Sequence, residues 1–393
     1  MKFSHLNFFI VLLMCNCYAQ PTTIKATKTM TYSSPIEYNH AIHKDQSIIN
    51  DPILIFQKPI DNDRSDVIFI NESGKVITSI SISLHQRFQW ANIDKIANEV
   101  FICTPIFYNK KRPENGTKHY ITNVYNARGQ LKLRFQDNFA TLAPFSAKYY
   151  ITVYPDPEDS GDGPTYLVDD AGNKIRLLNK QGAFTIWHRD DQRILAWNDN
   201  KLSAYNPMAE LLFEKELQIE GFVRMNPSVS DSGQICFTTT KSNIYVTDRN
   251  ADIIKIIPAK KFIGSVRAQI SHDGRFLLWA NSSRTMGERI KNRNSQIVLY
   301  DLSNDTIVWE KVLLAEASKS WSPKQMGFSN EGDLTFINFH DGDLLLFNQV
   351  GRQIFSTNLK SPSVDFVFSF LQHRLIAYNH KSNEITIFKL IGE

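Results

Sequence analysis

The chain of 393 residues has few glycines, few cysteines and little net charge. Its 17 glycines fall below the usual ~7 %, which argues against a glycine-rich nucleotide-binding architecture. The 44 Lys and Arg against 40 Asp and Glu leave a net charge of +4, too weak a basic field to attract nucleic acid. Charged residues make up 21 % and hydrophobic residues 42 %. This composition is that of an ordinary globular protein.

Catalytic motifs are also missing. The sequence holds no G-x-S-x-G, Walker or H-E-x-x-H motif, and no C-x-x-C. The histidines are scattered over different parts of the chain, so we expect no shared metal site. These absences favour a protein without catalytic activity, although they leave the question of an enzyme open.

The start of the chain is typical of an export signal. Lys2 supplies a positive charge, and Phe8–Met14 is an apolar run that is too short to span a bilayer but fits the core of a signal peptide. Ala19 is a small residue before Gln20, where we expect cleavage. The sequence therefore predicts a cleaved signal peptide over residues 1–19.

The mature chain is then predicted to be one exported domain over residues 20–393, periplasmic or extracellular. No later segment has 18 consecutive apolar residues, so no transmembrane segment is expected. The alternative is a lipid-anchored protein, with Cys15 or Cys17 as the lipidated residue. The two remaining cysteines, Cys103 and Cys236, lie far apart in apolar strand-like runs, and we expect both to be buried free thiols.

An internal repeat governs the fold. One pattern recurs: an apolar strand, an Asp or Asn, a short turn and a second apolar strand. The copies read VIFINESGKVITSISI, TNVYNARGQLKLRF, TYLVDDAGNKIRLL, LSAYNPMAELLFEK, IYVTDRNADIIKII, IVLYDLSNDTIVWE, LLLFNQVGRQIFST and ITIFKLIGE. Their anchor residues are Asn71, Asn126, Asp169, Asn206, Asp248, Asp301, Asn348 and, in a degenerate last copy, Lys389. The repeat has a period of about 45 residues, within the range of propeller blades.

Each copy has the chemistry of a β-hairpin. The Asp or Asn side chain can accept a hydrogen bond from the backbone two residues on, and a glycine three positions later tolerates the left-handed conformation that closes the turn. Copies with Ala209, Ala251 or Asn304 at the glycine position must close less comfortably or use another turn.

A second hairpin precedes the first in the later copies. Its turns are Ser230-Asp231-Ser232-Gly233, Ser271-His272-Asp273-Gly274 and Ser329-Asn330-Glu331-Gly332. Each period therefore carries four antiparallel strands, named a, b, c and d. Their alternation is only approximate, as expected for sheets packed on both faces. Repeated four-stranded units predict an all-β protein, a β-propeller.

The segment ISHDGRFLLWANSS…SQIVLYDLS resembles the WD-like repeat of TolB-type β-propellers. The turn in that family is Ser-Pro-Asp-Gly, and here Asp231, His272 or Asn330 stands at the proline position. The resemblance is clear over residues 225–359 and weaker elsewhere. It implies the propeller fold and says little about function, because propellers host many unrelated activities.

Eight anchors predict eight blades, with seven as the alternative because strand a of the first repeat is poorly defined. The last copy reaches only strand c. We expect a strand within residues 23–33 to complete that blade, which would remove exposed sheet edges.

The long connections hold the candidate binding residues. In a blade, the b–c loops and the d–a connections emerge on one face, where residues 109–118, 155–164 and 281–295 are longer than a hairpin needs. Trp321, between two blades, can stack on a sugar or anchor a partner. The partner-binding residues predicted from these segments are Lys110, Lys111, Arg112, Asp156, Asp159 and Trp321.

An acidic loop offers a possible Ca²⁺ site. Four carboxylates are close together in PDPEDSGDGP, and Ca²⁺ prefers such oxygen ligands. They are Asp156, Glu158, Asp159 and Asp162. The spacing does not match an EF-hand, so a solvated loop without any metal or cofactor is the favoured interpretation.

The sequence thus favours a non-catalytic binding or scaffold module: a monomeric propeller that binds a protein or a glycan. Two alternatives stay open, a propeller hydrolase or lyase with its site at the central channel, and a structural subunit of an envelope complex. Acids or histidines from several blades converging at the channel mouth would favour the enzyme.

Overall fold

The computed structural model of this protein contains β-strands and no helix among the residues that it describes. None of these residues belongs to a helix long and apolar enough to cross a membrane. The described residues are 54–59, 64–70, 76–83, 90–94, 99–106, 119–126, 130–136, 139–142, 149–155, 162–169, 171–179, 185–188, 193–206, 208, 210–259, 266–282, 294–314, 323–329, 332–339, 342–358, 364–369, 374–379 and 384–389.

The described strands form antiparallel sheets in which each strand pairs with its neighbours in sequence. Three-stranded sheets stand first and last, with four-stranded sheets between them. The first four sheets are β1 (Leu54–Pro59), β2 (Arg64–Ile70) and β3 (Val76–Ser83); β4 (Trp90–Asp94), β5 (Glu99–Ile106), β6 (His119–Asn126) and β7 (Leu131–Gln136); β8 (Phe139–Leu142), β9 (Tyr149–Pro155), β10 (Asp162–Asp169) and β11 (Lys174–Asn179); and β12 (Thr185–His188), β13 (Arg193–Asn198), β14 (Lys201–Tyr205) and β15 (Leu211–Glu216).

The remaining sheets continue the same order. They are β16 (Val223–Val229), β17 (Ile235–Thr239), β18 (Asn243–Thr247) and β19 (Ile253–Pro258); β20 (Val266–Ile270), β21 (Phe276–Ser282), β22 (Ser295–Asp301) and β23 (Thr306–Leu313); β24 (Pro323–Phe328), β25 (Leu334–Phe339), β26 (Asp343–Asn348) and β27 (Gln353–Asn358); and β28 (Val364–Ser369), β29 (Arg374–Asn379) and β30 (Glu384–Lys389).

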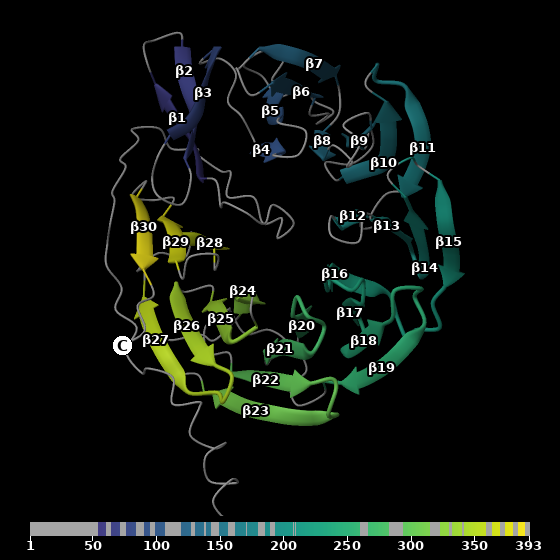
Figure 1. The fold of residues 1–393 in the computed structure, drawn as a ribbon, viewed down its shortest axis with the longest axis vertical. Helices are drawn as coiled ribbons and strands as arrows, with labels where there is room; N and C mark the ends of the chain where they lie inside the picture. Colours follow the sequence, from purple (N-terminus) through teal and green to yellow (C-terminus); the bar gives the residue numbers. More distant parts are fainter. Residues whose placement is uncertain are drawn as a thin grey trace, which may run out of the picture.

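The sheets stand around a common axis (Figure 1). In the four-stranded sheets the first strand lies nearest the axis and the fourth lies on the outside, so that β11, β15, β19 and β23 follow one another along the outer rim. The predicted a, b, c and d strands are therefore the successive strands of each sheet. In the four-stranded sheets the hairpin that the repeat predicts falls between the third and fourth strands, and in the first sheet it joins β2 and β3, which confirms the repeat assignment for these copies.

The core consists of apolar layers between adjacent sheets. Strand β21 shows why: Phe276, Leu278 and Ala280 pack toward the sheet of β24–β27, whereas Leu277 and Trp279 pack toward the sheet of β16–β19. Every residue of β21 is buried. A strand covered on both faces has no polar side, which explains the continuous apolar runs in the sequence.

The strand that we expect to close the ring, within residues 23–33, lies outside the described residues. The sheets β1–β3 and β28–β30 each have three strands among the residues described.

Candidate functional site

The turns between the third and fourth strands close as their sequence predicts. The Asp169 carboxylate accepts hydrogen bonds from the backbone N–H groups of Ala171 at 3.0 Å and Asn173 at 2.7 Å. The hydrogen bond from the Asn173 side chain adds to these and lowers the pKa of Asp169 below its ordinary value. Gly172 takes a φ of +86°. Asp or Asn is thus needed as the acceptor, and glycine as the left-handed residue.

Turns that lack glycine three positions after the anchor residue close in two different ways. Ala251 takes the same left-handed conformation, with a φ of +65°, despite its Cβ. In the turn after Asp301, Asp305 rather than Asn304 has the positive φ, +56°, so the turn closes one residue later. Ala209 lies outside the described residues. Both turns agree with the sequence, which predicts that a repeat without glycine at this position either strains its backbone or uses another type of turn.

The turns between the first and second strands depend on a serine. The Ser271 hydroxyl accepts a hydrogen bond from the backbone N–H of Phe276 at 2.8 Å and donates one to Asp273. Gly274, with a φ of +74°, donates its backbone N–H to the Ser271 carbonyl. Ser230 and Ser329 occupy the equivalent positions and accept from the backbone in the same way. Serine at this place therefore fixes the turn.

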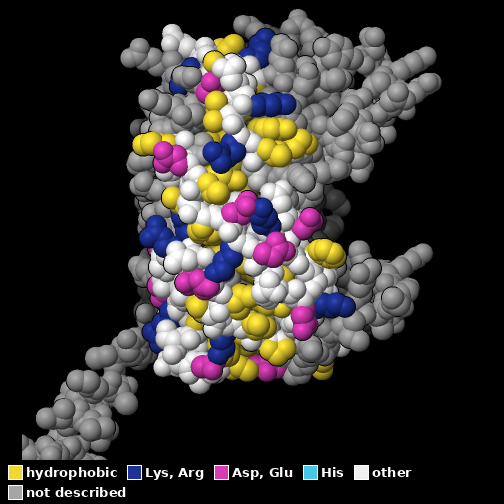
Figure 2. Space-filling view, turned by 90° about the vertical axis from the view of Figure 1, so that its right-hand side faces the viewer, with side chains coloured by type: hydrophobic (Ala, Val, Ile, Leu, Met, Phe, Trp, Pro, Cys, Tyr) yellow, Lys and Arg dark blue, Asp and Glu magenta, His cyan; other side chains and the backbone are white. Residues whose placement is uncertain are grey.

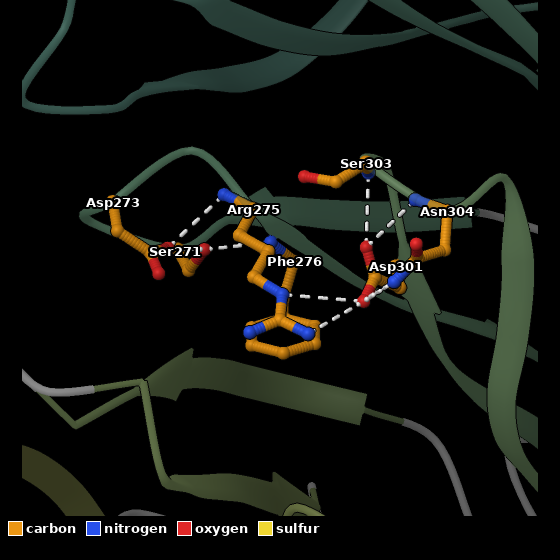
Figure 3. A network of polar contacts seen from close by, with 7 residues as sticks. All are labelled: Ser271, Asp273, Arg275, Phe276, Asp301, Ser303 and Asn304. Carbon is orange, nitrogen blue, oxygen red and sulfur yellow. Dashed lines mark hydrogen bonds and ion pairs between the residues drawn. The ribbon is translucent and has the colours of Figure 1, made fainter.

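An ion pair ties two turns of one sheet together (Figure 3). The Arg275 guanidinium, from the turn before β21, donates to Asp301 at the end of β22, with an Nη2–Oδ2 distance of 3.0 Å. Asp301 also accepts from the backbone N–H groups of Ser303 and Asn304 and from the Asn304 side chain. Burial alone would raise the pKa of Asp301, but these hydrogen bonds outweigh burial and lower it.

Neighbouring sheets are also joined through this face. The backbone N–H of Asp231 donates to the His272 carbonyl at 2.8 Å, and the Asp231 carboxylate lies 3.2 Å from Nδ1 of His272. Arg193 reaches from β13 to the carbonyls of Gly233 and Arg249 in the next sheet. The turn face is thus a framework of polar groups bound to one another.

The described residues show no metal or nucleophile site on this framework. No group of three or more His, Cys, Asp or Glu side chains among them is arranged to hold a metal ion. The Cys236 thiol is free and fully buried, and burial raises its pKa to about 12. Such a thiol is inert, because the thiolate is the reactive form.

The outer rim has a repeated feature that sequence reasoning missed. The last strand of each sheet from β1–β3 to β24–β27 has a β-bulge just after its turn, where the register skips one residue. The skipped residues are Ile77, Lys132, Ile175, Leu212, Ile254, Val308 and Ile354. All but one are aliphatic. The signal was present in the sequence, because most of these residues stand six positions after the anchor Asp or Asn.

Four of the skipped aliphatic side chains are exposed, and we name them the apolar belt. They are Ile175 (48 % exposed), Leu212 (51 %), Ile254 (52 %) and Val308 (39 %). Figure 2 views the rim of β11, β15 and β19 and shows apolar side chains at the surface between basic and acidic side chains. These four side chains occupy the same position in four successive sheets.

The predicted binding residues lie outside the described residues. Lys110, Lys111 and Arg112 fall between β5 and β6, and Asp156 and Asp159 fall between β9 and β10. Trp321 falls between β23 and β24, and Glu158 lies in the same connection as Asp156. Asp162 begins β10. These residues and the Ca²⁺ site stay predictions.

The comparisons with known proteins concern the fold. No family model matches the chain, and no curated protein matches it. The C-terminal WD40 domain of Sif2 is similar with a TM-score of 0.60 at 11 % identity, over 94 % of this chain and 99 % of that one. BamB from Moraxella catarrhalis is similar with a TM-score of 0.56 at 12 % identity, over 92 % of this chain and 97 % of that one.

A third solved structure is also similar to this chain in its fold. The WD40 domain of coronin from Toxoplasma gondii is similar with a TM-score of 0.51 at 8 % identity, over 95 % of this chain and 87 % of that one. Identities this low concern the fold alone. The four-stranded antiparallel sheets, their ring arrangement and these neighbours agree with the resemblance seen in the sequence. The fold of this chain is that of the WD40-like β-propellers.

Proposed function

We propose that this chain is an exported, non-catalytic β-propeller that acts as a binding or scaffold module for a protein partner. One observation carries the proposal: the two faces of the ring differ in the length of their connections. The turns of one face are short and bonded to one another. On the other face, Ile106 and His119 bound one connection and Ser282 and Ser295 bound another, far longer than a hairpin needs.

Long connections on a rigid scaffold are where binding tends to reside. The candidate residues Lys110, Lys111, Arg112, Asp156 and Asp159 belong to two such connections. We infer that these connections contact the partner, with Trp321 as a further anchor. No specific observation among the described residues favours the hydrolase or lyase alternative.

The exposed apolar side chains favour a protein over a glycan as partner. Those on the fourth strands are leucine, isoleucine and valine, such as Leu177, Leu211 and Ile256. Glycans are bound mainly by polar groups and flat aromatic rings, whereas aliphatic side chains are suited to a protein surface.

We further propose eight blades and a ring closed by the segment 23–33. The three-stranded sheet β28–β30 lacks a fourth strand among the described residues, and an added strand there would cover the free edge of β30. The N-terminal sequence supports export, and we expect the mature protein to begin at Gln20. Edman sequencing of the protein from its native source tests the cleavage site, and a retained residue 1 would contradict it.

Capture from native envelopes tests the binding function. The mature chain with a C-terminal tag should retain one protein in stoichiometric amount after mild crosslinking. A variant in which residues 109–118 and 155–164 are each shortened to four residues should fold normally and capture less.

Thermal unfolding supplies the control, because the shortened variant must melt near the parent. Equal capture by a folded shortened variant would remove the loop face from the proposal. Absence of any stoichiometric protein would overturn the binding function itself.

A further inference from the structure

The connection between β15 and β16 presents an aromatic ring to solvent. The ring belongs to Phe222, whose side chain is 63 % exposed. We propose that Phe222 anchors the protein partner by entering an apolar pocket on the surface of that partner. The inference rests on the proposed role as a binding module and names one residue through which the module makes contact.

Hydrogen bonds hold the backbone at Phe222 in place. The Phe222 N–H donates to Oγ1 of Thr240 at 3.2 Å, and the Thr240 N–H donates to the Phe222 carbonyl at 2.9 Å. Gly221 has a φ of +81°, and a Cβ there would lie 2.4 Å from Oγ1 of Thr240. The chain at Phe222 is therefore packed closely against the turn between β17 and β18.

The rest of this connection is tied to the buried part of the sheets. Leu217 is buried, and its N–H donates to the Asn200 carbonyl at 2.8 Å. The Glu220 N–H donates to the hydroxyl of Tyr245 at 2.9 Å, and Tyr245 is 2 % exposed. An aromatic side chain on such a rigid support loses little conformational freedom on binding, which is why rigid aromatic residues often anchor protein interfaces.

Contacts between neighbouring sheets lead from this connection to one of the long connections. Ser242 lies in the same turn as Thr240, and its carbonyl accepts from the Ala259 N–H at 3.2 Å. The Ala259 carbonyl in turn accepts from the side chain of Asn281 at 2.8 Å. Asn281 precedes Ser282, where β21 ends and the long connection begins. Phe222 thus lies on the face that we propose for binding.

The residues around the ring favour an apolar pocket of a protein over a sugar. Residues 217–222 and 240–243, which we name the Phe222 platform, contain two charged residues of opposite sign, Glu220 and Lys241. The Glu220 carboxylate accepts from the Asn243 side chain at 3.3 Å, and Oγ1 of Thr240 accepts from the Phe222 N–H. These acceptors already have donors within the protein, whereas a sugar needs polar groups directed at its hydroxyl groups.

The same residues disfavour a membrane surface. Attachment to anionic lipids requires an excess of Lys and Arg. The Phe222 platform has no such excess, because its one basic residue is balanced by one acidic residue.

Photocrosslinking from position 222 tests the proposal. Benzoylphenylalanine in place of Phe222 should crosslink one protein in native envelopes, through an apolar segment of that protein. The matched control carries benzoylphenylalanine in place of Val350, which is 76 % exposed but lies in the turn between β26 and β27, on the opposite face. The control should not crosslink that protein.

Binding of the purified crosslinking partner then measures the contribution of the ring. We expect F222A to bind it at least about tenfold more weakly than the parent, and V350A to bind it as the parent does. Both substitutions shorten an exposed side chain, so both variants should melt near the parent. Thermal unfolding checks this for each variant.

Equal binding by F222A and the parent would overturn the proposal, as would a crosslink from position 222 to a second copy of the chain alone. Binding of oligosaccharides or lipid vesicles that F222A abolishes would overturn it too, because the ring would then contact a sugar or a membrane. A partner captured by the mature chain that neither crosslinks at position 222 nor depends on Phe222 would contradict this anchor and leave the binding function standing. Absence of any captured protein would overturn both.

Discussion

Gly351 and Gly172 occupy equivalent turns but have different surroundings. Both have positive φ, +76° and +86°. A Cβ at Gly351 would lie 2.5 Å from Cγ of the buried Trp309, whereas a Cβ at Gly172 would meet nothing within 4 Å. The first glycine is thus required by both backbone and packing, and the second by backbone alone.

We expect G172A to lower the free energy of unfolding by about 1–2 kcal/mol, the cost of a left-handed alanine. G351A should lower it by about 2–4 kcal/mol, because overpacking adds to that cost. Urea unfolding of both variants measures the difference. Equal effects would mean that the Trp309 ring moves aside freely.

The burial of Cys236 predicts that its thiol is unreactive in the folded protein. Its thiol is fully buried with a pKa of about 12, so iodoacetamide at pH 8 should not modify it in the folded protein. Unfolding in urea without reductant should allow two alkylations of the mature chain, at Cys103 and Cys236. Intact mass counts them. A chain that takes none would hold a disulfide and contradict the repeat assignment.

The raised pKa of Cys236 also fixes the direction of a pH effect. The folded thiol holds its proton more tightly than the unfolded thiol, whose ordinary pKa is 9.0. This contribution to stability is complete below pH 8 and is lost as the pH rises from about 9 toward about 12. The C236A variant has no thiol to ionise. It should therefore lose less stability than the parent protein as the pH rises from about 9 toward about 12.

At the scale of the element, Asp301 joins the two hairpins of the β20–β23 sheet. Its side chain is 6 % exposed and accepts hydrogen bonds from Arg275, Ser303 and Asn304. D301A should lower the free energy of unfolding by about 2–4 kcal/mol, since several hydrogen bonds to one buried, charged acceptor are lost together. D305N removes the exposed ion pair with Lys255 and should change it by less than about 1 kcal/mol. Similar effects of both changes would contradict the structural role of Asp301.

Because its folded pKa is lowered, Asp301 stabilises the protein above its ordinary pKa of 3.8. That stabilisation should be lost as the pH falls below 3.8 toward the lower folded value. Comparing the parent with D301N from pH 7 to pH 3 isolates this effect. The two proteins should become more alike in stability at acid pH.

At the scale of the whole molecule, closure of the ring makes the decisive prediction. Deletion of residues 20–34 would remove the strand that we propose beside β30. An open edge should lower the melting temperature and promote aggregation. Light scattering during heating measures both. A truncated chain as soluble and heat-resistant as the mature protein would show that another segment closes the ring.

The repeat, the hairpins and the all-β class could be predicted from local patterns in the sequence. These follow from local chemistry: Asp248 needs only its own turn to accept backbone hydrogen bonds, and Ser271 likewise. The continuous burial of β21 was expected from its apolar run. Local signals therefore sufficed for the elements and their order.

The side chains exposed on the rim could not be predicted from the sequence and follow from the three-dimensional fold. Ile254 and Leu177 read as ordinary strand residues, and their exposure depends on the bulges and on the absence of a further strand outside β19 and β11 among the described residues. The join between sheets through Asp231 and His272 likewise involves residues distant in sequence. Exposure and long-range pairing depend on how sheets meet in space, which no local pattern encodes.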